Sequence, residues 1–178
     1  MYKVESDFEY KGYRCVVIFS GMGHRCGYVG VPSGHMLYKK HYTDYLDISK
    51  SELDDEEIGN RGMIPILSAA FDDDERARLD YWFNVHGGLT YSGDGNYPIE
   101  SDLWWFGFDC AHYNDGKDLD LVEKYWGDDP RIKERLKIDR EFPSYYEDNP
   151  IRSKEYVEDE CKSLVEQIIK LESQRLKW

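Results

Sequence analysis

The sequence predicts an α+β fold, in which an antiparallel sheet of five or six strands carries helices packed on one of its faces. Residues 1–115 contain short apolar, β-branched segments separated by glycine turns, which is typical of strands. The last third contains three helical segments, and the final one carries a long apolar stripe. We expect one domain over residues 1–178, mainly β in 1–115 and helical in 116–178.

The first strands follow from local patterns. Tyr2–Tyr10 alternates weakly, and Tyr13–Ser20 contains an apolar, β-branched run that favours a buried strand. Lys11-Gly12 between them indicates a two-residue turn, so these segments form a predicted β-hairpin. Cys26–Val31 is the predicted third strand.

Residues 35–78 carry a weaker pattern, which we interpret as a loop or insertion. Ser51 can cap a short acidic helix that runs through Asp54. Ile58–Phe71 contains two glycines and a proline, which favours irregular structure.

Two further strands are predicted before the helical part. Apolar and polar residues alternate over Leu79–Val85, ahead of the Gly87-Gly88 break, and Leu89–Ser92 continues that strand or returns beside it. Leu103–His112 has apolar residues on both faces, as a central strand requires.

The helical part begins with Asp118–Trp126 and a short helix with Asp129 as its cap and Pro130 at its first position. A long helix is predicted from about Pro150 to Lys177. Its apolar stripe needs a partner, either the sheet face or a second copy of the chain in a homodimer. The stripe consists of Val157, Cys161, Leu164, Val165, Ile168, Leu171 and Arg175.

The charge balance limits the classes of partner. The chain has 23 basic and 36 acidic residues, a net charge of −13. Direct DNA or RNA binding is disfavoured, because that binding depends on clustered Lys and Arg. An acidic surface instead suits a protein partner with a basic groove, or serves solubility alone.

The four cysteines form no CxxC pair, and the sequence shows no secretory segment or long apolar span. We therefore expect a reduced protein in the cytosol, with no membrane association. Cys15 and Cys161 are interpreted as buried hydrophobic residues. Cys26 and Cys110 have more suggestive neighbours.

Three blocks rich in glycine, histidine and aromatic residues are the candidate functional segments. They are Ser20–Gly34, His86–Gly95 and Trp104–Asp115, and each contains one histidine. Their glycines allow positive φ and close backbone approach, while their aromatic rings offer stacking surfaces. A pocket lined by Tyr28, His86, Tyr91, Trp104 and Trp105 is one interpretation; hairpin turns and a two-sided core are the other.

Two catalytic alternatives use the same blocks. A zinc site would combine the His24/Cys26 and Cys110/His112 pairs, although zinc motifs usually have wider spacing. A Cys–His site would use Cys110 as the nucleophile, His86 or His112 as the base and Asp109 to orient the imidazole. We favour neither, so we expect no metal and no cofactor, and binding rather than catalysis.

Taken together in this order, the blocks resemble a group of short phage and prophage proteins. The resemblance depends on CGYVGVPSGH (Cys26–His35), VHGGLTYSG (Val85–Gly93) and WWFGFDCAHYND (Trp104–Asp115). The last block departs from the usual CAHAGD at Tyr113-Asn114, and the C-terminal third lies outside the resemblance. The resemblance implies phage origin, and accessory phage proteins commonly counter host immunity.

The resemblance and the charge together predict an anti-defence protein. The leading hypothesis is an acidic anti-CRISPR that blocks the nucleic-acid channel of a Cas9-type nuclease in the host cytosol. A sponge or small hydrolase for a nucleotide immune signal is the alternative, and a structural phage module is the third. The residues expected to border the functional surface are His86, Gly87, Gly88, Tyr91, Trp105, Asp109 and His112, with His86 and Asp109 as polar anchors.

Overall fold

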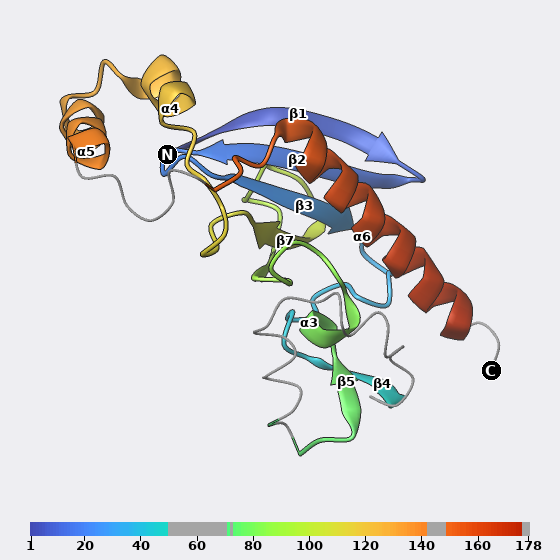
Figure 1. Ribbon diagram of the computed structural model, residues 1–178. Helices are drawn as coiled ribbons and strands as arrows, with labels where there is room; N and C mark the ends of the chain where they lie inside the picture. The colour runs from blue at the N-terminus through green and yellow to red at the C-terminus, as the bar shows by residue number, and fades with distance from the viewer. Residues whose placement is uncertain (50–70, 72, 142–148, 176–178) are drawn as a thin grey trace.

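A computed structural model describes residues 1–49, 71, 73–141 and 149–175 of the protein. It confirms the predicted α+β class (Figure 1). The main sheet has five strands in the order β1-β2-β3-β7-β6, and every neighbouring pair is antiparallel. These strands are β1 (Tyr2–Tyr10), β2 (Tyr13–Ser20), β3 (Arg25–Val31), β6 (Tyr91–Gly93) and β7 (Trp104–Asp109).

The first hairpin is confirmed. Lys11 and Gly12 have φ angles of 48° and 84°, the left-handed pair that a tight two-residue turn between β1 and β2 requires. The β1–β2 pairing shifts register between Val4 and Ser6, which leaves Glu5 without a partner in the ladder. Glu5 is therefore free to bond outside the sheet.

Both faces of the sheet are covered, as predicted for the central strand β7. Phe106 and Phe108 join the larger core on the face that carries the C-terminal helix. Trp105 packs on the opposite face with Val16 and Tyr28. This division follows from the two-residue period of side-chain direction along a strand.

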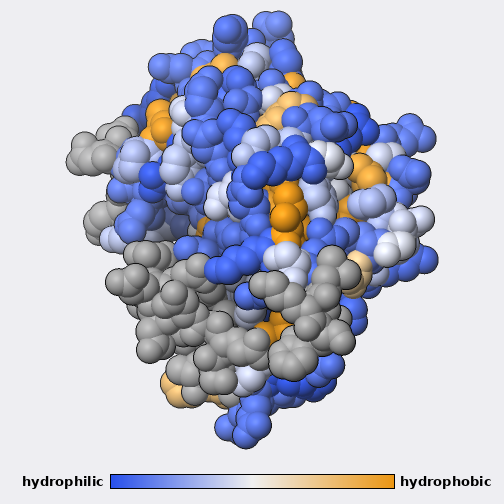
Figure 2. Space-filling view, turned by 90° about the vertical axis from the view of Figure 1, so that its right-hand side faces the viewer, coloured by the Kyte–Doolittle hydropathy of each residue, from blue (hydrophilic) through white to orange (hydrophobic). Residues whose placement is uncertain are grey.

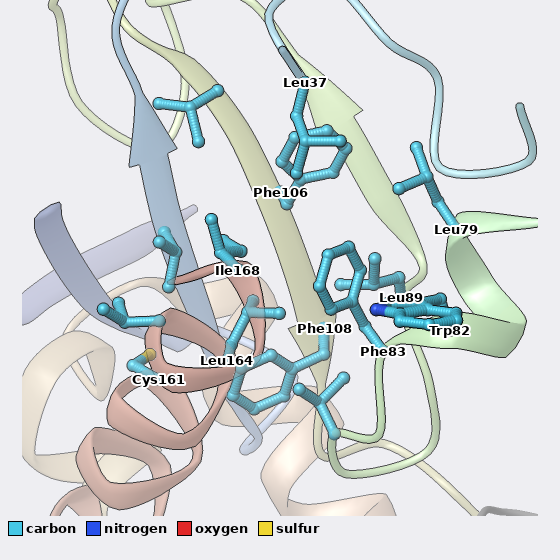
Figure 3. Close-up of a cluster of buried hydrophobic side chains, with 14 of the residues drawn as sticks. Leu37, Leu79, Trp82, Phe83, Leu89, Phe106, Phe108, Cys161, Leu164 and Ile168 are labelled. Carbon is cyan, nitrogen blue, oxygen red and sulfur yellow. The ribbon is translucent and has the colours of Figure 1, made fainter. Parts of the chain in front are cut away.

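The long helix α6 (Lys154–Arg175) lies across the sheet, and Figure 3 shows Cys161, Leu164 and Ile168 on the side of the helix that faces Phe106 and Phe108. A Cβ added at Gly27 of β3 would overlap the ring of Phe108, so this glycine allows the close packing. The stripe residues Val157, Cys161, Leu164, Val165, Ile168 and Leu171 are fully buried within the chain. Docking against the sheet is thus confirmed.

The start of α6 differs from the prediction. The helix begins at Lys154 rather than Pro150, because the hydroxyl of Ser153 accepts a hydrogen bond from the Tyr156 amide at 3.1 Å and caps the first turn. Residues 150–152 belong to no helix or strand, and Arg152 stands just outside the helix.

Two shorter helices precede α6. Helix α4 (Leu119–Trp126) forms where a helix was predicted, and the carboxylate of Asp118 caps it. Helix α5 (Pro130–Glu141) has Pro130 at its first position, as predicted, but is longer than predicted. Their apolar residues cover Phe19 at the end of β2, in a core cluster with Val122 and Leu136.

The strand predicted over Leu79–Val85 is wrong. The structure has a short strand, β5 (Arg76–Arg78), followed by one helical turn, α3 (Leu79–Trp82), which closes with a hydrogen bond from the Phe83 amide to the Leu79 carbonyl. This segment is buried from several sides, and the alternation of apolar and polar residues in its sequence does not come from a pleated strand. The buried residues are Leu79, Tyr81, Trp82, Phe83 and Val85.

Part of the segment interpreted as a loop forms a second, two-stranded sheet, in which β4 (Tyr45–Ser49) pairs with β5. The helix predicted from Ser51 through Asp54, and nearly all of Ile58–Phe71, lie outside the described residues. Within the described part of the chain, no helix combines the length and the apolar character needed to cross a membrane. Figure 2 shows one face of the molecule as largely hydrophilic, with small separate hydrophobic patches.

Candidate functional site

The second and third sequence blocks meet at the carboxylate of Asp115, whose side chain is 1% exposed. His86 Nε2 lies 2.8 Å from Asp115 Oδ2, and the His112 amide donates to the same oxygen at 3.0 Å. Arg152 Nε donates to the other oxygen, Oδ1, at 2.8 Å. Together with Tyr156, these four residues are called the Asp115 centre below.

The members of the centre come from three separate parts of the chain. His86 follows α3, His112 and Asp115 follow β7, and Arg152 and Tyr156 stand at the start of α6. Tyr156 Oη lies 2.9 Å from His86 Nδ1, so both ring nitrogens of His86 have partners. Glu160 also holds this residue, because its carboxylate accepts a hydrogen bond from the His86 amide at 2.7 Å.

Gly87 determines where the second imidazole lies. It has a φ of 68°, and a Cβ added there would overlap the ring of His112. The His112 ring packs in the space that a side chain at position 87 would fill, 5.4 Å from the His86 ring between centroids. The His-Gly sequence therefore brings the two imidazoles side by side.

The electrostatics of the centre keep Asp115 ionised. Burial by itself would raise the pKa of Asp115, but the hydrogen bonds from Arg152, His86 and the His112 amide outweigh it and hold the pKa below its usual value. Burial and the neighbouring Glu160 raise the pKa of Tyr156, so this hydroxyl stays protonated.

A buried ion pair holds the segment of chain that carries Arg152. Arg25 of β3 donates to Glu5 at 2.6 Å and, through Nη1, to the backbone carbonyl of Arg152 at 2.9 Å. The side chains of Arg25 and Glu5 are 9% and 8% exposed. The amide of Gly116 donates to the Pro150 carbonyl at 3.0 Å, which fixes the segment carrying Arg152 against the loop after β7.

Exposure separates the members that a ligand can reach from those that act as supports. The side chains of His112 and Arg152 are 30% and 26% exposed, whereas His86 is 12% exposed. Tyr113 and Ile151, next to these two residues in the chain, are 74% and 50% exposed. The reachable groups are thus one imidazole and one guanidinium beside an aromatic and an aliphatic side chain.

The structure divides the seven residues predicted for the functional surface. His86, Gly87 and His112 lie at the centre, and Gly88 forms the turn behind it, with its amide bonded to the Val85 carbonyl. The Asp109 carboxylate instead accepts from Thr90 Oγ1 at 2.8 Å and from the Ala111 amide at 3.1 Å. Asp115, and not Asp109, is the acid bonded to His86.

Tyr91 and Trp105 lie with the aromatic residues on the opposite face of the sheet. Trp105 is fully buried, and its indole donates to Ser101 Oγ at 3.1 Å. Tyr28 and Tyr97 share a 2.8 Å hydrogen bond there, while Trp104 packs in the other core. The predicted pocket that combined these rings with His86 therefore does not form.

The catalytic alternatives from the sequence also meet geometric obstacles. Cys26 packs with the Tyr28 and Trp105 cluster, whereas Cys110 lies in the core on the opposite face, so they cannot share a tetrahedral zinc site with His24 and His112. Burial raises the pKa of the Cys110 thiol, with a further contribution from Asp115. A buried thiol that resists ionisation is a poor nucleophile.

Sequence reasoning missed Asp115 as the hub, and it missed Arg152 and Tyr156 altogether. The available signal for Asp115 was its position three residues after His112 in the third block. Arg152 and Tyr156 gave none, because they join the site only through the path of residues 149–156. His24 is close enough to Asp115 for this carboxylate to affect its pKa, and its Nδ1 is buried without a hydrogen-bond partner in the described residues.

Comparison of the chain with models of known families, with curated proteins and with solved structures finds no match.

Proposed function

We propose that the protein binds a small phosphorylated ligand, of the nucleotide-signal class, at the Asp115 centre, and that it acts as an anti-defence protein by sequestering this ligand. The observation that carries the proposal is the pairing of reachable Arg152 and His112 with exposed Tyr113. A guanidinium and an imidazole suit phosphate oxygens, and an exposed phenol ring suits a nucleobase.

The size of the ligand follows from the charge of the protein. A net charge of −13 opposes a polynucleotide, which needs many cationic contacts along its backbone. A mononucleotide or a cyclic dinucleotide carries few phosphates and requires only a few local donors. The Asp115 centre supplies donors on that scale.

Binding is favoured over turnover by the state of the candidate catalytic groups. Both ring nitrogens of His86 are already bonded, and Cys110 is buried with a raised pKa. His112 is the more exposed of the two imidazoles and lies beside the buried carboxylate of Asp115. A ligand can therefore contact the His112 ring directly. Sequestration therefore needs no further group, whereas hydrolysis needs a free base or nucleophile.

The test is to incubate the protein with cyclic dinucleotides and with cyclic ADP-ribose-type signals, remove the protein by filtration, and then denature it and analyse what is released. Sequestration depletes the filtrate and returns the intact signal. Return of cleaved products would make the protein a hydrolase, and an unchanged filtrate for every signal would refute the proposal.

Matched variants locate the binding. Arg152→Gln and His112→Gln each remove one reachable donor, so affinity should fall about 10- to 100-fold, as for the loss of a charged hydrogen bond. The controls are Arg131→Gln and His41→Gln, which change exposed residues outside the centre. Equal losses in the controls would place the binding elsewhere.

A second candidate function, an acidic anti-CRISPR inhibitor of a Cas9-type nuclease, is favoured by a separate observation. The loop between β6 and β7 exposes the carboxylates of Asp94, Glu100 and Asp102, and none has an ion-pair partner among the described residues. Unpaired carboxylates on one loop can compete with phosphates for a basic groove.

The matching experiment is competition with guide and target nucleic acid for a Cas9-type nuclease at low and high salt. Neutralising Asp94, Glu100 and Asp102 together should weaken inhibition. Neutralising three exposed acids near α5, namely Asp128, Glu134 and Glu141, changes the net charge equally and is the control. Inhibition that is absent, or that responds equally to both triple variants, would exclude recognition through this loop.

A further inference from the structure

We propose that the Asp115 centre binds one divalent transition-metal ion of the zinc class through His86 Nε2, His112 Nδ1 and Asp115 Oδ2. Two imidazoles and one carboxylate form the ligand set of many catalytic zinc sites, which leave a fourth position open. The inference rests on the proposed function, because a phosphate oxygen of the proposed ligand would occupy that open position.

The spacing of the three donor atoms suits a single ion. All three lie within 4.8 Å of one another, with Asp115 Oδ2 2.8 Å from His86 Nε2 and 3.5 Å from His112 Nδ1. Ligand atoms of a tetrahedral zinc ion are about 3.3 Å apart, as follows from bond lengths near 2.0–2.1 Å. Small side-chain adjustments therefore place all three donors on one ion.

His112 provides an independent observation. Its Nδ1 atom is shielded from solvent and has no hydrogen-bond partner among the described residues. Asp115 Oδ2 lies outside the usual hydrogen-bond range of this nitrogen, at 3.5 Å. Buried polar atoms nearly always have a partner, and a metal ion would supply the missing one.

The surrounding contacts orient the ligands in the way that outer partners of metal sites do. Tyr156 Oη holds His86 Nδ1, the nitrogen that faces away from Asp115, and Glu160 holds the His86 amide. Arg152 binds Asp115 Oδ1 and so leaves Oδ2 toward the imidazoles. Gly87 sets the position of the His112 ring.

Metal binding would exchange the roles of the two His86 nitrogens. In a neutral ring without metal, Nε2–H donates to Asp115, because a carboxylate can only accept, and Nδ1 accepts from the Tyr156 hydroxyl. With metal, Nε2 gives its lone pair to the ion and Nδ1–H donates to Tyr156 Oη. In a neutral ring the proton therefore moves from Nε2 to Nδ1, which is a change of tautomer.

The experiment titrates ZnCl₂ into chelator-treated protein by calorimetry and records the ¹⁵N shifts of the histidine rings by NMR. We expect one Zn²⁺ per chain and a tautomer change at His86. Affinity should fall at least about 100-fold in His112→Gln and about 10- to 100-fold in Tyr156→Phe, which removes only the outer contact. His41→Gln, an exposed control, should bind as the parent does.

No saturable binding at one ion per chain would overturn the inference, as would parent-like binding by His112→Gln or a loss in His41→Gln. The Asp115 centre would then be a metal-free hydrogen-bonded cluster. Stoichiometric zinc binding without any nucleotide binding would support the inference and remove the proposed function. Nucleotide binding by protein that takes up no zinc would do the reverse.

Discussion

The imidazole of His112 packs against the backbone of Gly87, in the space where any other residue would carry its Cβ. The contact joins the loop after α3 to the loop after β7, and it sets the separation of the His86 and His112 rings at 5.4 Å. The second and third sequence blocks therefore come into contact because Gly87 has no side chain.

Gly87→Ala should destabilise the protein by more than backbone strain alone. A left-handed alanine costs about 1–2 kcal/mol, and displacement of the His112 ring adds about 1–3 kcal/mol. Gly34→Ala is the matched control, since Gly34 also has positive φ, at 90°, but open space around its Cβ position. Equal losses of unfolding free energy in urea would mean that the ring contact contributes nothing.

Arg25→Met should lower the free energy of unfolding by about 3–5 kcal/mol, because it leaves the buried carboxylate of Glu5 unpaired. The double variant Glu5→Gln/Arg25→Met should be less destabilised than the single variant, since no buried charge remains. Arg131→Met, which breaks an exposed pair with Asp129, should leave the free energy of unfolding close to that of the parent. A double variant as unstable as Arg25→Met would show that Glu5 is not the cause.

Stability should fall as the pH drops below about 6.5, the usual pKa of histidine. Burial lowers the pKa of both His24 and His35, with Lys117 adding to the effect at His24 and Glu172 opposing it at His35. The unfolded chain therefore binds these protons first, and stability rises with pH through this range. The double variant His24→Asn/His35→Asn should flatten the dependence in denaturant melts at pH 5 to 7, and an unchanged slope would contradict the assignment.

The cysteines should react slowly with a thiol reagent at pH 8 in the folded state. Cys15, Cys110 and Cys161 are buried, and burial raises their pKa values, while the pKa of the partly buried Cys26 is raised to about 11. Four thiols should titrate after unfolding, and Cys26→Ser should remove the first to react. Fast modification of Cys110 in the folded protein would restore the Cys–His alternative.

The sequence predicted the elements that depend on local patterns. The hairpin through Lys11-Gly12, the two-sided strand β7 and the apolar stripe of α6 are each visible in a short window, and all three are confirmed. A strand was wrongly predicted after Arg78, because apolar and polar residues alternate there. The alternation arises by chance in a segment that is buried from several sides.

The site was only partly predictable, since its parts meet through tertiary packing. His86 and His112 stand in conspicuous motifs, whereas Arg152 and Tyr156 belong to a helix start whose path depends on Ser153 and Arg25. Asp109 was predicted to be the acid beside the imidazoles, yet strand geometry turns it toward Thr90.

The helix α6 has a consequence for biosynthesis. Its buried face covers the sheet, and its first turns supply Tyr156 and Glu160 to His86. A nascent chain that has emerged from the ribosome only as far as β7 thus has an uncovered sheet face and an incomplete Asp115 centre. The centre is complete only after the final segment has been translated and has docked.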